Sequence, residues 1–282
     1  MKNNPYIMPE GVVIVNVSGG RTSRMMAIKI WENNRDRTDI YYLFQNTGRE
    51  RPQTYDFIRE LQDYGIPIII LEYRPTKPWF EVVGHNALSR NSEPFTALIE
   101  KRKYLPNIAQ RFCTEELKVK TARRYMRSLG YMKYHVAIGF RIDEPKRIEK
   151  MAARRSLALK KERGLIEIPV FPLVDAEIFA LDVKAFWAKM PFDLNLPILP
   201  NGKTVGGNCV GCFMHPEADR ARVARDEPEQ WQWLIEQEEK IGGTFCKEYS
   251  SSELQRRARS QLVMDYGDDN IFCLTAHSGC TD

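Results

Sequence analysis

One short segment constrains the fold of this chain more than any other: a run of β-branched residues that ends at a pair of glycines. Residues 12–17 read VVIVNV, which is typical of a strand buried on both faces of a parallel sheet. The turn Ser18-Gly19-Gly20 follows, and residues 25–31 then have the apolar spacing of a helix. This order places free backbone N–H groups and the positive end of a helix dipole at the carboxyl edge of a sheet. The segment therefore predicts a binding site for phosphate or another anion.

The side chains of this turn also suit an anion. Glycine permits positive φ and a close approach of the ligand to the backbone, and the hydroxyl and guanidinium groups that follow are hydrogen-bond donors. The candidate binding residues of the turn are Ser18, Gly19, Gly20, Arg21, Thr22 and Ser23. The alternative is an ordinary strand–helix turn capped by Ser18, because neither G-x-G-x-x-G nor G-x-x-x-x-G-K-[ST] is present.

Strands and helices alternate along the following residues. We expect further strands at residues 39–44, 66–71, 134–139 and 166–173, the last confined to a sheet edge by its prolines. This alternation predicts an α/β fold with a doubly wound, mostly parallel sheet. Residues 73–110 are expected to form loops and short helices, and the chain after Phe213 looks helical. We accordingly expect a nucleotide-binding α/β domain at residues 1–175 and a cysteine-containing helical region at residues 176–282.

Two further polar turns follow predicted strands. Thr47 and Gly48 follow the second strand, and Arg141 and Asp143 follow a later one. Ligands of such sheets lie beyond the carboxyl ends of the strands, so the turns are expected to meet over one ligand. Arg141 suits a phosphate or sulfate, and Asp143 with Glu144 suits Mg²⁺. The alternative for this last turn is an arginine–carboxylate pair at the surface.

A third candidate segment carries a cysteine between two cations. Thr114 is expected to cap a helix in which Lys118 lies one turn further on. Arg111 and Lys118 would then flank one anion. Cys113, at the start of this helix, is expected to have a lowered thiol pKa.

Cys209 and Cys212 stand three positions apart on a glycine-rich turn. This spacing can aim both sulfurs at one metal, and a complete site needs further ligands. Three interpretations stay open: an iron–sulfur cluster, a Zn²⁺ site, or a reduced or redox-active pair without metal. Six cysteines in a chain whose N-terminus lacks the apolar core of a signal peptide indicate a reducing compartment. We therefore expect a cytoplasmic protein.

The overall composition gives less information about binding partners than the motifs do. A net charge of +5 fits an anionic small substrate or a nucleic acid and establishes neither. No apolar run is long enough to span a bilayer, so no membrane partner is expected.

Five segments, in order, resemble the adenine nucleotide alpha-hydrolase-like superfamily, which includes the PP-loop ATP pyrophosphatases and the phosphoadenosine phosphosulfate (PAPS) reductases. They are residues 18–23, the segment FQNTGRERPQTYDFI at 44–58, and residues 111–118, 139–144 and 206–212. The resemblance implies an enzyme of sulfur chemistry that binds ATP or PAPS across the turns at Ser18, Thr47, Arg111 and Arg141. It also implies, by position, that Cys113 joins Cys209 and Cys212 in any metal site. The other candidate ligands in the sequence are Cys280, Cys273, Cys246, His215 and His277.

Within this resemblance, sulfonucleotide reduction is the first hypothesis. Cys280 would attack the sulfur of the bound sulfonucleotide, while Arg111, Lys118 and Arg141 stabilise charge on the leaving phosphate. The motif around Cys280 is Gly-Cys-Thr, where the reductases have Glu-Cys-Gly.

The second hypothesis is ATP-dependent adenylation of a nucleic acid or small molecule. Pyrophosphate would be released, and sulfur from a thiol or sulfur donor would be transferred through a cysteine. Arg21 stands where the ATP pyrophosphatases more often have lysine. A non-catalytic nucleotide-binding module is the third hypothesis.

Overall fold

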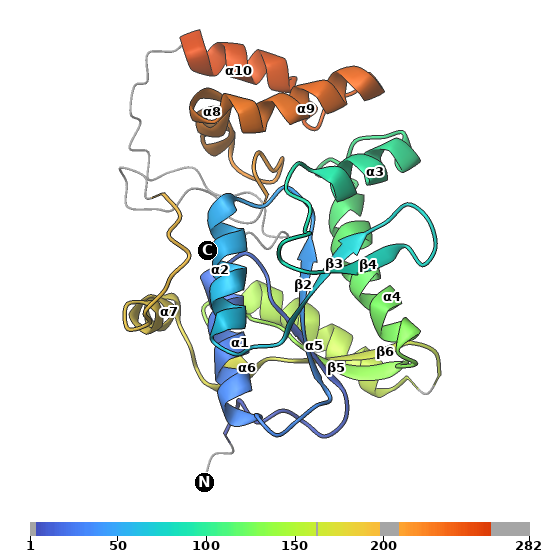
Figure 1. Cartoon of the computed structure of the whole chain (residues 1–282), viewed down its shortest axis with the longest axis vertical. Helices are drawn as coiled ribbons and strands as arrows, with labels where there is room; N and C mark the ends of the chain where they lie inside the picture. Colours follow the sequence, from blue (N-terminus) through green and yellow to red (C-terminus); the bar gives the residue numbers. More distant parts are fainter. Residues whose placement is uncertain (1–3, 162, 198–208, 261–282) are drawn as a thin grey trace.

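A six-stranded sheet forms the centre of the protein (Figure 1). The computed structural model describes residues 4–161, 163–197 and 209–260. The strand order is β4-β3-β2-β1-β5-β6; β4 runs antiparallel to β3, and the other pairs are parallel. The strands are β1 (Val13–Asn16), β2 (Ile40–Asn46), β3 (Ile68–Tyr73), β4 (Phe80–Val83), β5 (Lys133–Ala137) and β6 (Ile166–Val170). The prediction of an α/β fold with a mostly parallel sheet is confirmed.

Helices cover both faces of this sheet, and successive strand residues point to opposite faces. Val13 and Val15 of β1 pack with the helices that follow β1 and β2, while Ile14 packs with Met126 on the other face. Burial on both faces explains why the sequence of the central strand β1 is almost continuously apolar. The helices of this part are α1 (Arg21–Asn33), α2 (Pro52–Asp63), α3 (Glu93–Arg102), η1 (Thr114–Lys120), α4 (Thr121–Ser128), α5 (Pro145–Leu159), α6 (Pro172–Asp175) and α7 (Ala180–Trp187).

Three C-terminal helices lie at one end of the molecule, beyond α2 and α3 (Figure 1). They are α8 (Glu217–Asp226), α9 (Pro228–Ile241) and α10 (Ser251–Ser260). Their core surrounds the fully buried Trp231 and includes Phe95 of α3 and Leu117 of η1. The helical C-terminal region is thereby confirmed. In contrast, α7 packs into the sheet core through Val183 and Trp187, so that core extends beyond residue 175. The domain division at residue 175 stays a prediction.

Two local expectations need correction. The segment 73–110 contains the strand β4, whose exposed residues gave no alternating apolar signal. The helix that was expected to begin at Thr114 begins earlier, because Phe112 and Cys113 are already helical. Thr114 is the first residue of the π-helical stretch η1 and does not cap it. The expected edge position of β6, in contrast, is confirmed, with Pro169 in register with Val136. Among the described residues, no helix has both the length and the apolar character needed to cross a membrane.

Candidate functional site

The turn after β1 folds its hydroxyl groups onto its own backbone. The Oγ atoms of Ser18 and Ser23 lie 2.7 Å apart, and Ser23 Oγ accepts from the Ser18 N–H at 3.0 Å and donates to the Gly20 carbonyl at 3.2 Å. Gly20 is the N-cap of α1, at a φ of −96° and without a side-chain cap. Ser18 is therefore not the capping residue, and Gly20 does not use positive φ. The N-terminus of α1 therefore lies at this turn, where the helix dipole favours an anion.

A buried arginine that the sequence analysis missed stabilises this turn through a hydrogen bond to its backbone. Arg24 is fully buried and donates through Nε to the Ser18 carbonyl at 3.0 Å and through a terminal nitrogen to the Thr54 carbonyl at 3.2 Å. Its guanidinium lies 4.1 Å from the ring centroid of Phe57. Burial lowers the pKa of Arg24 to about 9. Arg24 thus ties the turn after β1 to α2.

We expect Arg24→Lys to lower the free energy of unfolding by about 1–3 kcal/mol, because an ammonium group cannot serve two separated carbonyls as the guanidinium does. Arg35→Lys, at an exposed position beyond α1, is the matched control and should change stability by less than about 0.5 kcal/mol. Urea denaturation followed by circular dichroism measures both. Equal stabilities of the two variants would contradict a structural role for Arg24.

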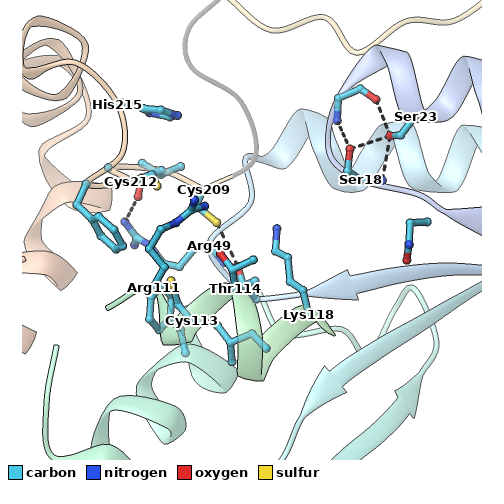
Figure 2. A pocket seen from close by; sticks show the side chains of 18 of the residues that line it. Ser18, Ser23, Arg49, Arg111, Cys113, Thr114, Lys118, Cys209, Cys212 and His215 are labelled. Carbon is cyan, nitrogen blue, oxygen red and sulfur yellow. Dashed lines mark hydrogen bonds between the residues drawn. The ribbon is translucent and has the colours of Figure 1, made fainter. Parts of the chain in front are cut away.

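One cavity of about 280 Å³ joins this turn to three cysteines (Figure 2). Cys113, Cys209 and Cys212 line it together with Ser18 and Ser23. The cysteines come from two segments almost a hundred positions apart, so the convergence of Cys113 with Cys209 and Cys212 is a tertiary feature. The predicted meeting of the turns at Ser18 and at residue 47 on one cavity is present as well, since Thr47 lines it.

Thr47 and Glu50 connect the end of β2 to the cysteines. Thr47 Oγ1 lies 3.7 Å from Cys209 Sγ and donates to the Glu50 carboxylate at 2.9 Å. Glu50 is buried, and its Oε1 lies 4.0 Å from Lys118 Nζ. Burial raises the pKa of Glu50, and the Lys118 charge opposes that shift. The Lys118 ammonium group and the Cys209 thiol therefore lie on the cavity wall, and the Glu50 carboxylate lies buried next to them.

Lys118 provides a positive charge among the thiols. Its side chain is 29% exposed, and Figure 2 shows it on the same side of the cavity as Thr114, across from Ser18. Burial alone would lower the pKa of Lys118, but its electrostatic interactions with Cys209, Glu50, Cys113 and Cys212 outweigh burial and raise that pKa. Lys118 therefore stays protonated at neutral pH.

The thiols themselves are poor acids in this environment. Burial raises the pKa of Cys209 to about 12, and Lys118 opposes the shift. Burial and the neighbouring Cys212 also raise the pKa of Cys113, so the expected lowering of its pKa is wrong. The physical reason is that Cys113 is half-buried within a helix that begins before it, where desolvation of a thiolate outweighs the helix dipole.

Arg49, which the sequence analysis also missed, fixes the cysteine turn. It is buried, and it donates to the carbonyls of Val210 at 2.8 Å and Gln230 at 3.1 Å. Its own carbonyl accepts from the Val210 N–H at 2.8 Å, and its guanidinium lies 4.5 Å from the ring centroid of Trp233. Burial lowers the pKa of Arg49 to about 10. The position of Cys209 and Cys212 thus depends on a residue of the turn after β2.

Several predicted cation and turn residues have structural partners. Arg21 forms a two-point ion pair with Asp193, at 2.6 and 2.7 Å, and does not line the cavity. Arg141 pairs with Asp143 at 2.9 Å and donates to Thr22 Oγ1 at 3.3 Å, which matches the arginine–carboxylate alternative.

The remaining predicted residues divide between the cavity wall and other places. Gly48 has a φ of +76°, and a Cβ there would lie 2.9 Å from the Ser92 backbone, so close packing explains this glycine. Gly19 is not on the cavity wall. Cys280 lies outside the described residues. The predicted residues on the wall are Ser18, Gly20, Thr22, Ser23, Thr47, Arg111, Cys113, Lys118, Cys209 and Cys212.

The cysteines have the right chemistry for a soft metal, but the described residues do not form a closed site. Thiolates are the usual ligands of iron–sulfur clusters and of structural zinc. Within residues 4–161, 163–197 and 209–260, no group of three or more Cys, His, Asp or Glu side chains is arranged to hold a metal ion. Iron–sulfur cluster, Zn²⁺ and metal-free thiols all stay predictions, as does Mg²⁺ at Asp143.

No family model matches the chain. It is 29% identical over 224 residues to the uncharacterized nin region protein ORF290 of Escherichia phage lambda, a match that spans 76% of this chain and 70% of that protein. Two solved structures are similar to it. One is the PAPS reductase of Candida auris in a phosphate complex, with a TM-score of 0.39 and 20% identity over 64% of this chain and 73% of the other. The second is the U34-tRNA thiolase NcsA of Methanococcus maripaludis with its 4Fe–4S cluster, with a TM-score of 0.39 and 12% identity over 92% and 76%.

Proposed function

We propose that the protein is an enzyme of sulfur chemistry that uses an adenine nucleotide, of the adenine nucleotide alpha-hydrolase-like kind that its motifs resemble. The observation that carries the proposal is the shared cavity, with the turn Ser18–Ser23 on one side and three thiols on the other. The N-terminus of α1 suits the nucleotide phosphates. Thiols facing that position suit sulfur transfer to or from the nucleotide-bound substrate.

Sulfonucleotide reduction is one version of this function. A thiolate attacks the sulfur of the sulfonucleotide, a sulfur–sulfur bond forms, and the sulfur–oxygen bond to the phosphate breaks. Cys280 remains the proposed nucleophile. Lys118 and Arg111, both on the cavity wall, suit the negative charge that collects on the departing phosphate.

ATP-dependent thiolation is the second version, and a specific observation favours it. Three thiols already share the cavity among the described residues, whereas reduction through Cys280 needs one nucleophile. In this version a substrate oxygen attacks the α-phosphate of ATP and pyrophosphate leaves. The outer sulfur of a persulfide on one cysteine then attacks the activated carbon and displaces AMP. A second thiol breaks the remaining sulfur–sulfur bond and releases the product; an external thiol reduces the resulting disulfide, and an external sulfur donor renews the persulfide.

Anaerobic calorimetric titration separates these versions. We expect the protein to bind either ATP with Mg²⁺ or PAPS, and Ser18→Ala to weaken that binding about tenfold, since the turn loses the hydroxyl that accepts from Gly20 and pairs with Ser23. The control is Ser260→Ala, at the exposed end of α10. ATP preference supports thiolation, with pyrophosphate release as the next assay, and PAPS preference supports reduction. If neither nucleotide binds, the turn is structural and the proposal fails.

The non-catalytic alternative makes a different prediction. Nucleotide would bind without turnover, and a Cys280→Ser variant would behave like the unmodified protein. Turnover that disappears on replacement of Cys209 or Cys280 would exclude it.

A further inference from the structure

The positive charge of this protein is concentrated in one segment. Residues 145–163, which include α5, contain eight lysines and arginines and two glutamates, a net charge of +6. The whole chain has a net charge of +5, so the other residues together carry −1. Seven of the eight cations are exposed: Lys146, Lys150, Arg154, Arg155, Lys160, Lys161 and Arg163. A basic surface this localised is typical of contact with a polyanion.

α5 is also poorly covered by the other residues that the structure describes. It runs beside β6, and none of its side chains is buried. Leu157 and Leu159 are 70% and 63% exposed. Apolar residues that remain exposed between cations mark a helix that lacks a partner rather than a helix whose only role is to cover the sheet.

A second cavity lies beneath this helix. Its volume is about 630 Å³, and it opens between α5, the η1–α4 helices and the sheet. Apolar side chains of the strands form its floor, while Arg154 and Lys161 stand on its α5 side. The buried Nε2 of Gln45, which also lines it, has no hydrogen-bond partner within the described structure. A flat ring with polar edges fits such walls better than a compact ion does.

This second cavity adjoins the cysteine cavity. Asn16, Lys118 and Ile138 line both. A group held in the second cavity therefore lies next to a wall that the cysteine cavity shares. The backbone that carries such a group would emerge at the exposed cations of α5.

We propose that α5 binds the phosphate backbone of a single-stranded nucleic acid and that the cavity beneath it receives one unpaired base. The base would be the sulfur acceptor, an assignment that rests on the proposed function. A single strand is required because the base edges of a duplex are already paired and stacked, and an enzyme reaches a base only after it leaves the stack. Phosphate contacts along α5 would provide most of the binding affinity, and insertion of the base would determine which nucleotide lies next to the cysteine cavity.

Charge reversal on α5 tests the backbone contact. Fluorescence anisotropy with the full chain is measured on labelled single-stranded RNA, single-stranded DNA and duplexes of the same sequence, at several salt concentrations. We expect Lys150→Glu with Arg154→Glu to weaken single-strand binding at least tenfold and to reduce the slope of log affinity against log salt by about 1.4, which corresponds to two lost phosphate contacts. The matched control reverses two exposed cations of α10, Arg256→Glu with Arg259→Glu, and should leave binding within twofold.

Three results would overturn this assignment. They are an equal loss in the α10 control, tighter binding of duplex than of both single strands, and binding of phosphatidylserine vesicles in place of oligonucleotides. Affinity for RNA over DNA, or the reverse, identifies the natural strand. Calorimetry with ATP or PAPS on the same α5 variant separates this proposal from the proposed function. If the variant binds nucleotide normally but no longer binds the oligonucleotide, both proposals are supported. If the unmodified protein binds no nucleotide, only the proposed function is refuted.

A pair of tryptophan substitutions tests the base pocket. Ala158 lines the second cavity, whereas Ala153 is exposed on α5 and does not. We expect Ala158→Trp to weaken binding of the oligonucleotide about tenfold but to leave binding of an abasic strand unchanged, because stacking and insertion of a base are lost while phosphate contacts stay. Ala153→Trp should alter neither. Equal effects of Ala158→Trp on both strands would refute a base in this cavity.

Discussion

Turnover should fall by about a hundredfold or more in a Lys118→Met variant, while the fold remains intact. The Lys118 ammonium group lies 4.0 Å from Glu50, and its charge is the larger of two influences that oppose burial at Cys209, the other being the hydrogen bond with Thr47. Methionine has a similar length and no charge. Without that charge, the thiol pKa of Cys209 rises further, the fraction of thiolate falls, and Glu50 loses its counter-ion.

The rate of alkylation by iodoacetamide provides a readout that does not require the substrate. Cys113 and Cys209 should react severalfold more slowly at pH 8.5 in Lys118→Met, since the reactive species is the thiolate. Lys120→Met is the matched control, because Lys120 pairs with Glu115 and Glu116, both at 2.9 Å, and is not on the cavity wall. Unchanged alkylation and turnover in Lys118→Met would mean that the thiols do not depend on this cation.

Gly211→Ala should lower the free energy of unfolding by about 2–5 kcal/mol, combining about 1–2 kcal/mol of backbone strain with about 1–3 kcal/mol of overpacking. Gly211 has a φ of +70°, and a Cβ at this position would lie 2.4 Å from Leu234 Cδ1 and 3.2 Å from the Trp231 ring. The turn that holds Cys209 and Cys212 would have to move away from α9. Unfolding by urea measures the loss.

Gly242→Ala separates the two contributions to this effect. Gly242 has almost the same φ, +73°, but a Cβ there would meet nothing within 4 Å. This control should cost only the backbone strain, about 1–2 kcal/mol. Equal losses in the two variants would show that the cysteine turn tolerates the added methyl group.

The sequence predicted what depends on local pattern. Runs of β-branched or aromatic residues that are largely buried identify β1, β2 and β3, because most of their residues are apolar. The strand β4 has no such signal, since it is an exposed edge strand in which Glu81 and Val82 face solvent. The π-helical stretch η1 also lacks a local signature. Its wider turn differs from an α-helix by one residue, which side-chain spacing does not reveal.

The candidate site was predictable only in part, because some of its residues are positioned by contacts between distant segments. The turns at Ser18 and Thr47 are read from glycines and hydroxyls that follow strands. The role of Arg24 could not be predicted in this way. An arginine on the apolar face of a helix interrupts the amphipathic pattern, and only the tertiary structure shows the two carbonyls to which it donates. Arg21, conversely, suits an anion by sequence, and its ion pair with Asp193 joins positions 172 residues apart. Whether an arginine faces the cavity therefore depends on ion pairs with residues that are distant in the sequence.

The link between the turn after β2 and the helical region has a consequence for chimeric proteins. Arg49 holds the carbonyls of Val210 and Gln230, and Arg51 forms an ion pair with Glu227 at 2.5 Å. A graft that replaced residues 209–260 with those of a relative would separate these arginines from the backbone and side chains to which they are fitted. The two segments should therefore be exchanged, and inherited, as a unit.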